Sequence, residues 1–137
     1  MCLIVKKGTP IKIAEEDIVC YKKLDIYKVK DGMELKSPYQ YFVYKLGEEY
    51  RTSFGIEENI EIGENAWWAD NEVQEFYENF PEGELMSYNK GFHSYKENKP
   101  RHWDRPNVEC IIPKDSQYVE DETGLICSES IIIIKIL

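Results

Sequence analysis

The sequence lacks the long apolar stretches by which membrane and secreted proteins are recognised. It has no run of about 20 apolar residues, which a membrane-spanning helix requires. The apolar run that follows Met1 is too short for a secretory signal, and the run Ile131–Ile134 is too short to cross a bilayer. We therefore expect a cytoplasmic protein with no membrane partner.

Metal and disulfide signatures are also missing. The four cysteines are widely spaced, and none belongs to a Cys-x-x-Cys motif. Only two histidines are present, His93 and His102, and neither has the local spacing of a zinc ligand. We predict no metal site, and we expect reduced, buried thiols that pack as small apolar side chains. These cysteines are Cys2, Cys20, Cys110 and Cys127.

Basic residues are absent from one long segment, residues 57–84, which carries ten Asp and Glu and no Lys or Arg. The whole chain has a net charge of −9, so the rest of the sequence is close to neutral. An acidic surface repels phosphate backbones, which argues against nucleic acid as a partner. Segment 57–84 is a candidate surface for a protein partner of basic character; the alternative is a solvated helix face that keeps the protein soluble.

What is present favours a single α+β domain that spans residues 1–137. The length suits one domain, and 42% hydrophobic residues are enough for a core. Short β-branched and aromatic runs such as Ile18–Tyr21 and Val108–Ile112 predict strands. Residues 25–30 alternate apolar and polar and precede Asp31-Gly32, which predicts a hairpin with a type I′ turn. We expect a strongly bent, mostly antiparallel sheet.

One amphipathic helix is predicted at about residues 66–80, where apolar residues recur at helical spacing and Pro81 follows. We expect it to dock on the sheet. Trp67 and Trp68 would then point about 100° apart on the helix. Either one indole is exposed in a partner interface, or the helix start packs over the sheet edge. The candidate partner-binding residues are Trp67, Trp68, Asp70, Glu72 and Glu75.

Several stretches together resemble a group of short bacterial and phage proteins that carry no assigned activity. These stretches are MCLIVKKGT, DIVCYK, GFHSYK and VECIIPKDSQY. A second resemblance is to ADP-ribosyltransferase-like domains, in which an aromatic strand is followed by Gly-Phe-His-Ser and then by an apolar strand that ends at proline. That resemblance implies NAD as cofactor, with Tyr21, His93, Ser94 and the late Glu129 as the matching positions.

Two functions remain open from the sequence. The first is a small non-catalytic binding or accessory domain, which needs no cofactor. The second is an ADP-ribosyltransferase-like or other small-ligand enzyme, with Tyr21, His93 and Glu129 as candidate catalytic residues. The enzyme hypothesis requires these side chains to converge on an open cleft with a carboxylate nearby, because charge that develops at the anomeric carbon has to be stabilised there. The binding hypothesis predicts that Tyr21 and His93 are separated or packed in apolar surroundings.

Overall fold

The computed structural model describes residues 3–38, 42–60, 85–100 and 105–137. This part of the chain consists of strands joined by turns and loops, and it contains no helix. The strands are β1 (Leu3–Lys6), β2 (Lys12–Ile13), β3 (Ile18–Lys22), β4 (Asp25–Val29), β5 (Gly32–Lys36), β6 (Val43–Tyr44), β7 (Glu49–Arg51), β8 (Gly55–Ile60), β9 (Leu85–Lys90), β10 (Phe92–Tyr95), β11 (Val108–Ile112), β12 (Gln117–Glu120), β13 (Leu125–Ser128) and β14 (Ser130–Ile136).

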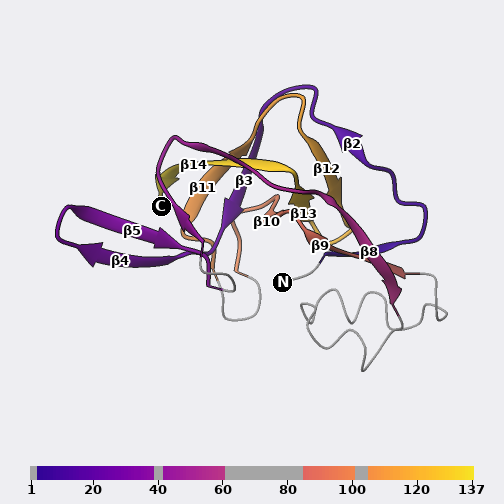
Figure 1. Cartoon of the computed structure of the whole chain (residues 1–137), viewed down its shortest axis with the longest axis horizontal. Helices are drawn as coiled ribbons and strands as arrows, with labels where there is room; N and C mark the ends of the chain where they lie inside the picture. Colours follow the sequence, from indigo (N-terminus) through magenta and orange to yellow (C-terminus); the bar gives the residue numbers. More distant parts are fainter. Residues whose placement is uncertain (1–2, 39–41, 61–84, 101–104) are drawn as a thin grey trace.

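The strands form three sheets. The main sheet has eight strands in the order β2-β12-β13-β10-β3-β11-β14-β7, and a three-stranded sheet has the order β1-β9-β8. The third sheet has the order β4-β5-β6. Figure 1 shows the β4–β5 hairpin extending from one side of the main sheet, while β8 and β9 lie toward the opposite side. Every strand pairing between these elements is antiparallel.

The main sheet has a buried face on each side, because alternate residues of a strand point in opposite directions. Strand β13 shows this, since all four of its residues are buried. On β11, Val108, Cys110 and Ile112 are buried, and the residues between them are half-buried. These three residues belong to a large core that also contains Cys20 and, from the β4-β5-β6 sheet, Leu35. The other face of the main sheet contributes Leu125, Cys127 and Val119 to a second core, which β1 and β9 cover with Leu3, Val5 and Tyr88.

The α+β fold class predicted from the sequence is wrong, because the described residues are all β. That prediction depended on a single segment, and the helix expected at about 66–80 lies outside the described residues. Elsewhere the apolar runs are short, alternating or β-branched, and such runs favour strands over helices. The predicted antiparallel pairing holds, but the pairing is divided among three sheets.

The predicted hairpin is confirmed, with a different turn. Strands β4 and β5 pair from Asp25↔Lys36 to Val29↔Gly32, so the two-residue loop is Lys30-Asp31. A type I′ turn at Asp31-Gly32 would need a positive φ at both residues. Gly32 has a φ of 134°, whereas Asp31 does not have a positive φ. Glycine is required here after the loop, because L residues rarely adopt this conformation.

Candidate functional site

The tip of the β4–β5 hairpin exposes apolar side chains on both of its faces. At its base, Ile26 and Leu35 lie opposite each other and contact the large core. Further out, the side chain of Tyr27 is 51% exposed and that of Met33 is 57% exposed. Tyr27 and Val29 share one face of the hairpin, while Met33 lies on the other face opposite Lys28.

Among the described residues, no strand pairs with the outer edge of the hairpin. In the sheet order β4-β5-β6, β4 has a partner on one side only. An edge strand presents a row of backbone N–H and C=O groups that can pair with another chain. A two-stranded hairpin in water is marginally stable by itself, so its anchorage to the core is needed to keep this edge in place.

Three exposed lysines lie before, on and just after β4: Lys23, Lys28 and Lys30. None of them has a hydrogen-bond or ion-pair partner in the part of the chain that the structure describes. The acidic residue on the same strand, Asp25, lies opposite Lys36 of β5. With Asp25 and Asp31 counted against the three lysines, residues 23–31 carry a net charge of +1 in a chain whose net charge is −9.

Tyr21 and His93, two of the sequence-predicted site residues, lie on adjacent strands of the main sheet. Tyr21 of β3 pairs with Tyr95 of β10, two residues beyond His93. The His93 Nε2 atom lies 3.1 Å from the backbone oxygen of Tyr88. Burial, together with the nearby Lys22 ammonium, lowers the pKa of His93 to about 3. The imidazole is thus neutral at physiological pH and hydrogen-bonded within the fold.

Glu129, the third candidate, holds two strands together at a turn. Its Oε1 atom accepts a hydrogen bond of 2.9 Å from the backbone N–H of Gln117. Its own backbone N–H donates to the Gln117 oxygen, and its oxygen accepts from Thr52. The structure places this carboxylate on a backbone amide of β12, and it brings neither Tyr21 nor His93 into contact with it.

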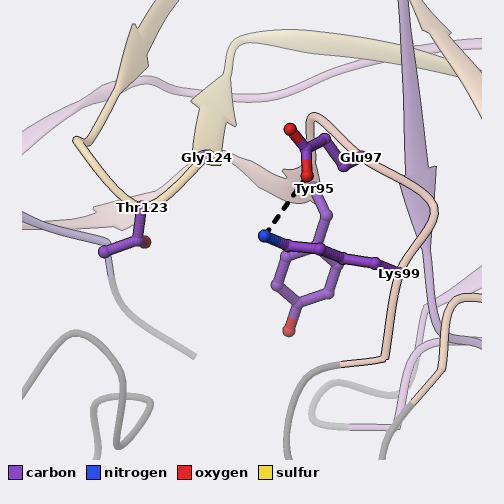
Figure 2. Close-up of a pocket in the computed structure, with 5 residues that line it drawn as sticks. All are labelled: Tyr95, Glu97, Lys99, Thr123 and Gly124. Atoms are coloured by element: carbon purple, nitrogen blue, oxygen red, sulfur yellow. Dashed lines mark ion pairs between the residues drawn. The ribbon is translucent and has the colours of Figure 1, made fainter.

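A small hollow lies beside Tyr95, between the loop after β10 and the turn before β13 (Figure 2). Glu97 and Lys99 form an ion pair of 3.2 Å across its rim, and Thr123 and Gly124 close the other side. The space is about 190 Å³ with open solvent included, below the roughly 300–1,000 Å³ of typical ligand pockets. His93, which the transferase resemblance assigns to a ligand, does not line it.

A buried cluster of thiols and one ammonium lies at the centre of the main sheet. Cys20 of β3 and Cys110 of β11 are directly opposite each other and fully buried. Lys22 lies two residues after Cys20, and its Nζ donates to the backbone oxygen of His93. Burial lowers the pKa of Lys22, and the neighbouring sulfur atoms oppose that effect. The sequence did not predict this pair, because no local pattern indicates that two cysteines 90 positions apart lie opposite each other.

The remaining sequence-predicted residues cannot be placed. Trp67, Trp68, Asp70, Glu72 and Glu75 lie outside the described residues, as does segment 57–84 apart from its first four residues in β8. Among the described residues, no group of three or more His, Cys, Asp or Glu side chains is arranged to share a metal ion. Nor does this part of the chain contain a helix of the length and apolarity that a bilayer demands.

Comparison with protein-family models, curated proteins and solved structures finds no match to this chain.

Proposed function

We propose that this protein is a small non-catalytic binding domain that acts in the cytosol and takes up an extended acidic segment of a protein partner along the free edge of β4. The observation that carries the proposal is the combination of an unpaired edge, exposed apolar side chains and unpartnered lysines on one projecting hairpin. A partner strand that pairs with a sheet edge gains its affinity from main-chain hydrogen bonds and its specificity from alternate side chains.

The lysines favour a partner strand that carries negative charge. A second β-strand with basic residues would meet Lys28 and Lys30 in like-charge contact, which is unfavourable across neighbouring strands. A strand with acidic residues would meet opposite charge, and its apolar residues would cover Tyr27 and Val29. Exposed ion pairs each contribute about 0.2–1 kcal/mol, so they favour correct encounter more than they add affinity.

Peptide binding followed by NMR tests this proposal. The probe is a synthetic peptide of roughly eight residues that alternates glutamate and valine, a length that matches a typical strand. We expect amide shift changes confined to residues 25–30 and an affinity that falls as salt is added. A lysine–valine peptide of equal length should not bind, and a glutamate–serine peptide should bind more weakly.

Two matched pairs of substitutions distinguish binding at the β4 edge from a general effect of net charge. The double substitution Lys28→Glu and Lys30→Glu should weaken binding of the acidic peptide at least about tenfold, which corresponds to roughly 1.4 kcal/mol. The control, Lys7→Glu with Lys114→Glu, makes the same change in net charge at exposed positions elsewhere and should leave the affinity within about twofold. Equal effects of the two pairs, or shift changes spread over other strands, would show that the β4 edge is not the binding site.

A further inference from the structure

The pairing of β3 with β11 brings two cysteines together in the middle of the main sheet. Cys20 and Cys110 are opposite partners in an uninterrupted antiparallel register that runs from Val108↔Lys22 to Ile112↔Ile18. Opposite residues in such a pair have Cα atoms about 4.5–5.5 Å apart, which lies within the roughly 4.4–6.8 Å range of disulfide-bonded cysteines. Both residues are free thiols in this structure.

The two thiols differ in their electrostatic surroundings. The hydrogen bond from Cys110 lowers the pKa of Cys20 against the opposing effect of burial, and the Lys22 ammonium adds to the lowering. The same hydrogen bond, together with burial, raises the pKa of Cys110. Of the two thiols, Cys20 therefore loses its proton more readily, and Cys110 holds its proton more tightly. A thiolate is the reactive nucleophile in cysteine chemistry.

A weak point in the sheet lies beside Cys20. Strand β3 pairs with β11 over five residues, but with β10 it shares only the pair Tyr95↔Tyr21. On that side, Lys22 bonds across to the His93 backbone oxygen. Segments with few backbone hydrogen bonds open more readily than full ladders. A small oxidant can reach the buried sulfur atoms by transient opening of this gap.

We propose that Cys20 and Cys110 are a redox-active pair that is oxidised reversibly to a disulfide by a peroxide. The Cys20 thiol gives up its proton, and the thiolate attacks one oxygen of hydrogen peroxide. An S–O bond forms, the O–O bond breaks, and the leaving hydroxide takes up the proton that Cys20 released and becomes water. The Cys110 sulfur then attacks the Cys20 sulfur; the S–S bond forms, the S–O bond breaks, and the departing hydroxide takes the Cys110 proton to become water. Two thiols lose two electrons, and one peroxide is reduced to two waters. A dithiol reductant reverses the change by thiol–disulfide exchange.

The remaining described cysteine, Cys127, provides a matched control. It is equally buried, but its partner across the β10–β13 ladder is His93, and its thiol lies 3.6 Å from the Lys90 backbone oxygen. Its partners in the two ladders are His93 of β10 and Val119 of β12, and neither is a cysteine. Replacement of Cys127 removes a buried thiol and leaves the proposed pair intact.

The experiment treats the full-length protein with hydrogen peroxide and follows intact mass and non-reducing peptide maps. The wild-type protein and the Cys127→Ala variant should lose about two mass units and give a Cys20–Cys110 cross-linked peptide that dithiothreitol abolishes. Cys20→Ala and Cys110→Ala should give no such peptide. Because either substitution leaves a cavity in the core, the wild-type map alone decides the pairing. A cross-link at another cysteine, or oxygen adducts without a cross-link, would overturn the proposal.

The rate of oxidation distinguishes a cysteine pair whose reactivity is raised by the Lys22 ammonium from two cysteines that are merely close. Lys22→Met removes the ammonium near the sulfur atoms and should slow disulfide formation several-fold at neutral pH. The control substitution Lys114→Met, at an exposed position, should leave the rate unchanged. Equal rates in Lys22→Met and wild-type protein would contradict the assigned role of the ammonium.

Discussion

Asn107 anchors the base of the hairpin, and its replacement by alanine should loosen that anchorage measurably. The Asn107 Oδ1 atom accepts a hydrogen bond of 2.8 Å from the Leu24 backbone N–H, and its Nδ2 donates one of 2.7 Å to the Leu24 oxygen. Leu24 is 1% exposed and connects β3 to β4. The Asn107 backbone N–H also donates to the Lys22 oxygen, and Asn107 accepts from the Leu137 N–H; both bonds survive the substitution.

The expected cost follows from those two side-chain bonds. Each bond contributes roughly 0.5–1.5 kcal/mol net, and buried backbone groups that lose their partners add a desolvation penalty of about 1–3 kcal/mol. Because water can enter the space that the side chain vacates, we expect Asn107→Ala to lower the free energy of unfolding by about 2–4 kcal/mol. For a domain of 137 residues this corresponds to a decrease in Tm of roughly 6–14 °C.

Urea unfolding and thermal melts measure this change, with Asn98→Ala as control. Asn98 is exposed and makes no described hydrogen bond, so its replacement should change the unfolding free energy by less than about 0.5 kcal/mol. Amide hydrogen exchange should also speed up at Leu24 in Asn107→Ala. A loss below about 1 kcal/mol with unchanged exchange at Leu24 would refute the idea that this side chain fixes the hairpin base.

Two further predictions concern the second core. The pKa of His93 lies at about 3 in the folded protein, below its unfolded value of about 6.5. Between these two pH values the unfolded chain therefore binds more protons than the folded protein. The free energy of unfolding should fall by up to about 1.4 kcal/mol per pH unit as the pH drops through this window. The His93→Gln variant should lack this component of the pH dependence in urea titrations, and a parallel pH dependence in both proteins would contradict it. Gly91→Ala should cost roughly 3 kcal/mol or more, because a Cβ would lie 2.5 Å from Cys127 Sγ and 3.0 Å from the Ser128 oxygen at a φ of 141°. Gly55→Ala, with open space and an ordinary φ, should have a small effect in the same melts; equal costs at the two glycines would contradict the steric explanation.

Local patterns in the sequence predicted local structure well. The alternation of residues 25–30 and the β-branched run Val108–Ile112 both form strands, and the hairpin is confirmed. Such alternation is typical of a strand with one buried face. Instead, only the base of the hairpin is buried, since β4 and β5 extend beyond the body that Ile26 and Leu35 contact. How far a strand projects depends on the size of the sheet beneath it, which no local pattern encodes.

Long-range pairing was the part that sequence patterns could not supply. Strand period and composition identify β3 and β11 separately, but they do not say that Cys20 lies opposite Cys110 or that Tyr21 lies opposite Tyr95. A register shift of one residue would reverse the faces of every side chain. For the same reason the candidate set Tyr21, His93 and Glu129, taken from order along the chain, did not anticipate that Glu129 binds the Gln117 backbone.

The hairpin edge and the cysteine pair depend on the same two strands. Strand β3 ends at Lys22, and Leu24 leads directly into β4, while Asn107 precedes the first residue of β11 and clamps Leu24 in place. A disulfide between Cys20 and Cys110 would link β3 covalently to β11, three residues along the chain from Asn107. The proposed binding edge projects from that junction, so we expect the stiffness of the β3–β11 pair to set how firmly the edge is held. An edge that is held firmly loses less conformational entropy when a partner strand adds to it.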